Sequence, residues 1–146
     1  MPEIIRIGGV ELRFLRSKEE TGGSLDMFEM TLQPNARMPV PHHHEGWDET
    51  VYGLAGTSTW RIGGREVEVA PGGTAFIWRG IVHGFTNRGS LDAKFLAIAT
   101  PGVFGPAYFR EIGDVLAAEG PPDLGTIANV MRRHGLTPDV PARASA

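Results

Sequence analysis

The chain of 146 residues contains no cysteine. Disulfide bonds, thiolate metal ligands and a cysteine nucleophile are therefore excluded, and we expect a cytoplasmic protein. An excess of positive charge is also missing, because 14 lysines and arginines stand against 17 acidic residues. Bulk charge therefore does not attract nucleic acid. Long apolar runs are missing as well, so we expect neither a membrane-spanning helix nor a signal peptide. We expect a soluble protein with neither a nucleic-acid nor a membrane partner.

Glycine and proline, in contrast, are abundant, with 20 and 11 residues. They occur without a triplet period and punctuate short runs of β-forming residues, as in an all-β sandwich or barrel. We predict ten strands at residues 3–7, 10–15, 25–32, 37–44, 49–54, 57–62, 65–69, 74–78, 82–86 and 93–100. Helical spacing of apolar residues then predicts helices over residues 107–119 and 123–134. We therefore divide the chain into a barrel domain, 1–104, and a C-terminal helical extension, 105–146. The extension should pack on the barrel or on a partner subunit and end in a frayed tail from residue 136.

The chemistry concentrates in the histidines, of which the chain has five. His42, His43 and His44 are consecutive, and side chains alternate along a strand, so His42 and His44 share one face while His43 points away. Glu49 follows after a short turn, and His83 could join from another strand. Three imidazoles and one carboxylate suit a divalent transition metal, namely Fe, Mn, Co, Ni, Cu or Zn, better than calcium or magnesium.

These residues resemble the two sequence motifs of the cupins. The first cupin motif is Gly, five residues, His-x-His, three or four residues, Glu, six residues, Gly, and His42, His44, Glu49 and Gly56 match its spacing. The second is Gly, five residues, Pro-x-Gly, two residues, His, three residues, Asn, and it is matched at four positions: Gly72, Gly80, His83 and Asn87. Ala36 replaces the leading glycine and Trp78 replaces the proline, so the departures fall at turn or strand-end positions. The chain is also similar to small quercetin-dioxygenase-like cupins.

The resemblance implies a double-stranded β-helix, the jelly-roll barrel of cupins, with His42, His44, Glu49 and His83 facing inward onto one metal ion. Glu49 would be either a fixed ligand or a general base. Because each imidazole must be neutral to bind, we expect metal affinity to fall below about pH 6. Asn87 is interpreted as a turn or hydrogen-bonding residue rather than a ligand.

Several polar residues near the motifs have simpler interpretations. Strand parity turns His43 and Asp48 outward, towards the surface. Arg79 could meet an anionic substrate, but solvent exposure is the more common state of an arginine. His134 falls in the last turn of a helix, where it would be a charge partner of the helix C-terminus.

The pocket lining follows from the same parity argument. Met38 and Val40 share the face of His42, and Phe85 shares the face of His83, so these residues should point inward. Trp78 could narrow the barrel mouth. Each of these apolar residues could equally be ordinary core. Further aromatic and methionine candidates, whose facing the sequence leaves open, are Phe28, Met30, Trp60, Phe76 and Phe95.

Three functions remain open for such a site. Resemblance favours a dioxygenase-like oxidoreductase that acts on a small-molecule substrate. The same metal could instead serve an isomerase, decarboxylase or lyase, acting as a Lewis acid without dioxygen. The third possibility is a non-catalytic module that binds a small molecule. We also expect a homodimer, because small cupins commonly pair through edge strands and residues 3–15 supply a candidate edge.

Overall fold

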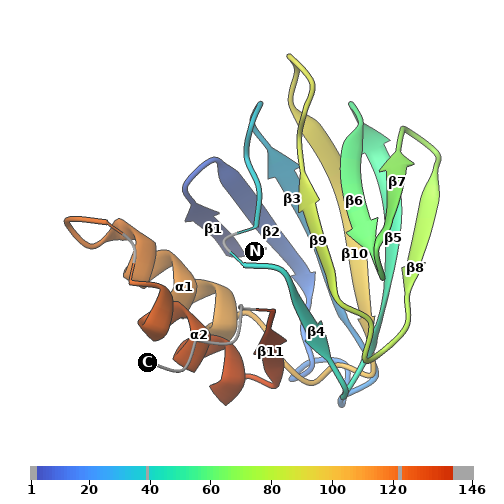
Figure 1. Cartoon of the computed structure of the whole chain (residues 1–146). Coiled ribbons are helices and arrows are strands. Elements are labelled where there is room, and N and C mark those ends of the chain that lie inside the picture. Colours follow the sequence, from blue (N-terminus) through green and yellow to red (C-terminus); the bar gives the residue numbers. More distant parts are fainter. Residues whose placement is uncertain (1–2, 39, 122, 140–146) are drawn as a thin grey trace.

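The computed structural model describes residues 3–38, 40–121 and 123–139, which form a β-barrel followed by two helices (Figure 1). The strands are β1 (Glu3–Ile7), β2 (Val10–Arg16), β3 (Asp26–Leu32), β4 (His42–His44), β5 (Asp48–Ala55), β6 (Ser58–Ile62), β7 (Arg65–Val69), β8 (Thr74–Ile77), β9 (His83–Thr86), β10 (Ala93–Thr100) and β11 (Leu136–Pro138). The helices are α1 (Ala107–Ala117) and α2 (Leu124–Arg133).

The strands form two facing sheets whose neighbours are antiparallel. One sheet has the order β1-β2-β3-β10-β5-β8, and the other has the order β11-β4-β9-β6-β7. All ten predicted strands are present, although several ends differ by a few residues. The largest difference is the run 37–44, which shortens to β4 because Arg37 makes only an isolated bridge to Thr86. The expected all-β barrel is therefore confirmed.

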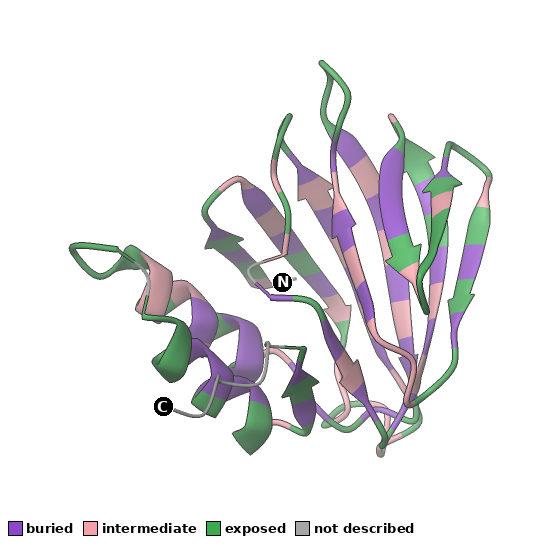
Figure 2. Cartoon of the chain, viewed as in Figure 1, coloured by how far each residue is buried: buried purple, intermediate pink, exposed green. Residues whose placement is uncertain are grey.

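Alternation along the central strands places the core between the two sheets. In β3 and β10 every second residue is buried, and these two strands lie side by side with Phe95 opposite Met30. Figure 2 shows the resulting alternation of buried and less buried positions along the strands. Phe28, Trp60 and Phe95 are almost completely buried. Such apolar burial contributes roughly 1.5–3 kcal/mol for each large side chain, so the barrel is a packed core.

Two turns show why the motif positions hold the residues they do. Gly56 has a φ of 59°, and a Cβ there would lie 2.3 Å from the carbonyl oxygen of Asp92. Both the backbone conformation and the close approach therefore require glycine. At the other turn, Ala36 stands in place of a motif glycine, and the positive φ, 68°, falls on the preceding Asn35. Asparagine tolerates this left-handed conformation well, so the turn survives the replacement.

The two helices cover the side of the barrel where the sheets diverge (Figure 1). Helix α1 packs against β1, helix α2 packs against β11, and the helices pack against each other. Since β1 and β11 are the outermost strands of their sheets, the helical pair bridges these two edges. Asp123 caps α2 by accepting hydrogen bonds from the backbone N–H groups of Gly125 and Thr126, which fixes the start of the helix.

The expectation of a frayed tail from residue 136 is wrong for its first three residues. Leu136–Pro138 form β11, which pairs with β4, so that Leu136 lies opposite His44. Residues 140–146 lie outside the described part of the chain. The expected homodimer stays a prediction, which light scattering after size exclusion can test. Among the described residues, no helix is both long enough and apolar enough to cross a membrane.

Candidate metal centre

Three histidines from two neighbouring strands meet inside the barrel. His42 and His44 occupy the first and last positions of β4, and His83 opens β9, where it pairs directly with His42. One ring nitrogen from each lies within 4.8 Å of the others, and all three side chains are buried. His43, at the middle of β4, is outside this group and instead lies 3.6 Å from the carboxylate of Glu45. The alternation of side chains along β4 thus separates the histidines as the sequence predicts.

Hydrogen bonds orient each of the three rings in the same way. The Nδ1–H groups donate to backbone carbonyls: His42 to Val40 at 3.3 Å, His44 to Trp47 at 2.9 Å and His83 to Ile81 at 2.9 Å. This arrangement fixes the tautomer, because the proton is held on Nδ1 and the lone pair of Nε2 is left for another partner. The buried Nε2 of His44 has no hydrogen-bond partner among the described residues. A buried imidazole with an uncommitted lone pair fits a metal ligand.

Glu49 lies beside this cluster on β5. Its carboxylate oxygen is 3.8 Å from Nε2 of His44, which is too long for a hydrogen bond. The residue is 9% exposed and faces the same pocket as the histidines. It stands outside the group whose ligand atoms lie within 4.8 Å of one another. Glu49 is therefore close enough to His44 to share a metal ion after a small movement, or to act beside it.

Burial sets the protonation of all four groups. It lowers the pKa of His44 to about 4 and lowers the pKa of His83 as well. The pKa of His42 lies well below its ordinary value. Burial is the largest cause, and repulsion from the positive charges that His83 and His44 would carry is the next. Burial acts in the opposite direction on the carboxyl group and raises the pKa of Glu49 to about 7. At neutral pH the imidazoles are neutral, as metal ligands must be, while Glu49 is poised between its two forms.

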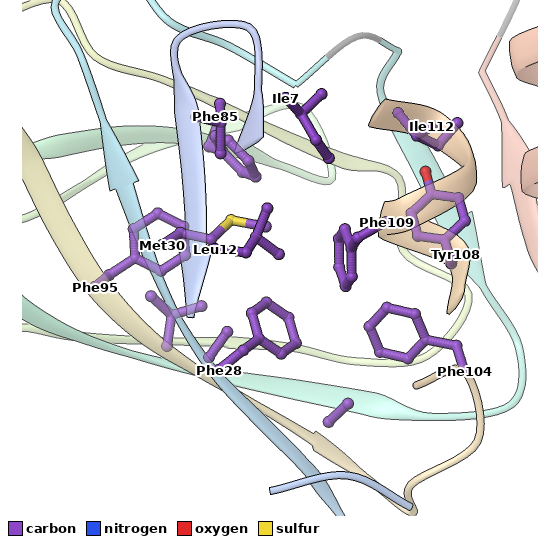
Figure 3. Close-up of a cluster of buried hydrophobic side chains, with 14 of the residues drawn as sticks. Ile7, Leu12, Phe28, Met30, Phe85, Phe95, Phe104, Tyr108, Phe109 and Ile112 are labelled. Atoms are coloured by element: carbon purple, nitrogen blue, oxygen red, sulfur yellow. The ribbon is translucent and has the colours of Figure 1, made fainter. Parts of the chain in front are cut away.

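The histidines open onto a pocket whose walls are almost entirely apolar. Its cavity volume is about 60 Å³, several times the roughly 10–15 Å³ that one water molecule needs. Figure 3 shows Phe104, Tyr108 and Phe109 lying opposite Leu12 and Phe28 from the barrel. The ring of Phe109 lies 5.2 Å from that of Phe28, edge to face. The pocket is thus enclosed by the barrel on one side and by the C-terminal segment on the other.

Three of the four residues predicted to line the pocket do so: Met38, Val40 and Phe85. Trp78 does not, because it is 66% exposed and packs against Phe76 on the outer surface, with ring centroids 4.7 Å apart. The reason is strand parity. In β8 the buried residues are Ala75 and Ile77, so the alternate positions, including Trp78 just beyond the strand, face out.

The aromatic and methionine candidates whose facing was left open divide into three groups. Phe28, Met30 and Phe95 line the pocket. Trp60 is buried in the core away from the pocket, and Phe76 is exposed.

The nearby polar residues take structural roles. Asp48 accepts hydrogen bonds from the backbone and guanidinium of Arg79, which lowers the pKa of Asp48. Asn87 is buried and its amide donates to the carbonyls of Leu32 and Leu91, as expected of a turn residue. His134 ends α2 and contacts Glu111 of α1 at 2.9 Å, so it links the two helices.

The sequence did not identify the C-terminal wall of the pocket. Phe104, Tyr108, Phe109, Ile112, Met131 and Leu136 all line it. The sequence predicted that the two helices pack on the barrel or on a partner subunit, but it did not place any of their residues in the pocket. Trp47 was missed as well, although it is 2% exposed and lies against His44.

Comparison with known proteins shows which protein family this chain resembles in sequence and in fold. The Cupin domain family matches residues 28–99, which include all four candidate ligands. The chain is 34% identical over 92 residues to an oxalate-binding protein of Thermotoga maritima, covering 62% of this chain and 75% of the other.

Two solved structures show the same likeness. One is a predicted oxalate decarboxylase of Thermotoga maritima, with 31% identity, a TM-score of 0.62 and coverage of 69% and 92% of the two chains. The other is the polyketide cyclase RemF of Streptomyces resistomycificus, with 30% identity, a TM-score of 0.58 and coverage of 68% and 72%.

Proposed function

Because this chain belongs to the cupin superfamily and gathers three buried histidines at an apolar pocket, we propose that it is an enzyme that uses one divalent transition metal to act on a small oxygen-bearing molecule. One observation carries the proposal. The Nδ1 atoms of His42, His44 and His83 are committed to backbone carbonyls, which leaves three Nε2 lone pairs for a common partner. A nitrogen-rich set of this kind suits Fe, Mn, Co, Ni, Cu or Zn.

The ion, when bound, supplies a Lewis acid that polarises a substrate oxygen. The chain supplies the rest. Among the described residues that line the pocket, Glu49 carries the one carboxyl group, and it would take a proton from a carbon next to a carbonyl and return it. The apolar walls keep bulk water away from the reacting atoms. This division of roles supports an isomerase, decarboxylase or lyase, including a cyclising enzyme.

A dioxygenase-like oxidoreductase is the second candidate. The donor set favours it, since imidazole-rich centres accommodate iron and copper as readily as zinc. The relatives favour the first candidate, because two similar structures are described as a predicted oxalate decarboxylase and a polyketide cyclase. The description of the curated relative as an oxalate-binding protein supports the non-catalytic alternative.

One set of measurements distinguishes the three candidate functions. Protein purified without chelators or nickel resin is analysed for metals and then loaded with each of the six ions in turn. Loaded protein is incubated in D₂O under argon with small 2-oxo and 2-hydroxy acids, and hydrogen–deuterium exchange is followed by NMR. Parallel samples in air are followed with an oxygen electrode. Exchange under argon that Glu49→Gln abolishes supports the first candidate, whereas consumption of oxygen supports the second. Metal binding without either reaction would refute the proposal of an enzyme.

A further inference from the structure

The ionisable side chains that could serve as metal ligands or proton acceptors in the pocket, His42, His44, His83 and Glu49, lie together on one side of it. Of the described residues that line it, only His42, His44, His83, Glu49, Trp47 and Tyr108 carry a polar atom in the side chain. None of the described lining residues is a lysine or an arginine. A ligand that enters the pocket can therefore place charge beside the metal, but its other end meets a wall of carbon and sulfur in which the neutral hydroxyl of Tyr108 is the one polar side-chain group among the described residues.

The C-terminal segment makes this far wall. Phe104, Phe109 and Met131 come from the segment after residue 99, where the match to the Cupin domain family ends. The segment is anchored from both sides: Arg110 of α1 pairs with Glu3 of β1, and β11 pairs with β4. The wall is therefore fixed to both sheets, and it belongs to the part of the chain that the family match leaves out.

The size of the cavity also limits how large a ligand can be. At about 60 Å³ it holds more than a water molecule, yet it lies well below the roughly 150 Å³ of an engineered cavity that holds benzene. Met131 of α2 is 1% exposed and closes one side, whereas Ile127 of the same helix is equally buried but does not line the pocket. The two residues thus form a matched pair for testing the wall.

We infer that the pocket selects a ligand with an oxygen-chelating head and a short, uncharged apolar tail, and that the C-terminal wall enforces this choice. This inference rests on the proposed function, because the head is held at the metal centre. It excludes small dianions whose second carboxylate would face the wall. An ionised carboxylate buried without a partner loses its hydration and gains nothing in return, whereas an apolar tail of the same shape gains from burial.

Two acids of matched shape test the inference. Malate and 2-hydroxy-4-methylpentanoate share a 2-hydroxy acid head and have tails with the same number of heavy atoms, so they differ chiefly in the charge of the tail. Protein loaded with Co²⁺ is titrated with each acid, and the visible absorption of the ion reports binding without any turnover. We expect 2-hydroxy-4-methylpentanoate to bind at least about tenfold more tightly than malate. Equal binding, or tighter binding of malate, would overturn the inference and leave the proposed function intact.

The wall is tested with mandelate, whose phenyl tail is bulkier than the branched tail of 2-hydroxy-4-methylpentanoate. We expect Met131→Ala to tighten mandelate binding at least about fivefold relative to 2-hydroxy-4-methylpentanoate, because the truncation leaves a cavity next to the tail. Ile127→Ala removes a similar buried side chain and should leave that ratio unchanged. The same change in both variants, or in neither, would refute the role of the wall. If Co²⁺ binds but no acid alters its spectrum, the proposed function fails, and the inference fails with it.

Discussion

His44 and Trp47 hold each other through two separate contacts. Their rings are stacked, with centroids 4.2 Å apart and planes within 13° of parallel, and the Nδ1–H of His44 donates to the backbone carbonyl of Trp47 at 2.9 Å. Trp47 also stacks on Phe104, at 4.8 Å and 2°. A proposed metal ligand is therefore supported from behind by an aromatic stack that reaches the C-terminal segment.

This stack predicts that Trp47 positions His44. Trp47→Ala should weaken metal binding by about 10- to 100-fold, the range typical of residues that orient a metal ligand. Trp47→Phe keeps a flat ring and should recover most of the affinity. Competition with a chromophoric chelator measures both. The matched control is Trp78→Ala, which removes an exposed indole. If Trp78→Ala weakens binding as much as Trp47→Ala, the positioning role is wrong.

The histidines themselves give the most direct prediction. His44→Ala should remove most of the bound metal, because it deletes one of three converging ring nitrogens, whereas His43→Ala should retain it. The two variants differ by a single position on β4, so they have similar effects on the strand. Elemental analysis of the purified proteins checks the prediction. Equal metal content in the two variants would contradict the assignment of the ligands.

The sequence was sufficient to predict the group of three histidines but not the pocket. The alternation of side chains on a strand placed His42 and His44 on one face, and the resemblance to the cupin motifs added His83, which lies on another strand. The wall could not be predicted in the same way. Leu136 lies in a three-residue strand, which is too short to show a period, and its pairing with β4 spans about ninety residues. Trp78 occupies a motif position, yet the parity of β8 turns it outward.

The pH dependence of metal binding also differs from the sequence-based expectation. Free imidazoles would compete with the metal below about pH 6, but burial lowers the pKa of His44 to about 4 and lowers the pKa of His42 and His83 as well, so protons compete for these rings only at lower pH. Burial raises the pKa of Glu49 to about 7, so Glu49 is the group that must release a proton. Affinity should therefore level off above pH 7 and fall by up to about tenfold per pH unit below it.

The variant Glu49→Gln distinguishes proton binding at Glu49 from proton binding at the histidines as the cause of the pH dependence. The variant should bind metal more weakly at pH 8, yet its affinity should fall less steeply between pH 7 and 5 than that of the unchanged protein, since the carboxyl group of Glu49 no longer takes up a proton. Chelator competition across that range, with the chelator calibrated at each pH, gives the comparison. A slope in Glu49→Gln as steep as in the unchanged protein would show that the histidines carry the pH dependence.

Alanine variants of two glycines distinguish the free-energy cost of backbone strain from the cost of a steric clash. Gly56 and Gly72 have positive φ values of 59° and 82°, so alanine at either position costs about 1 kcal/mol of backbone strain. A Cβ at Gly72 would meet no atom within 4 Å, whereas a Cβ at Gly56 would lie 2.3 Å from the Asp92 carbonyl oxygen. Gly56→Ala must therefore also displace the backbone at the start of β10, and should cost at least about 2 kcal/mol more than Gly72→Ala. Urea unfolding of the two variants measures the difference, and equal destabilisation would mean that the turn at Asp92 moves away freely.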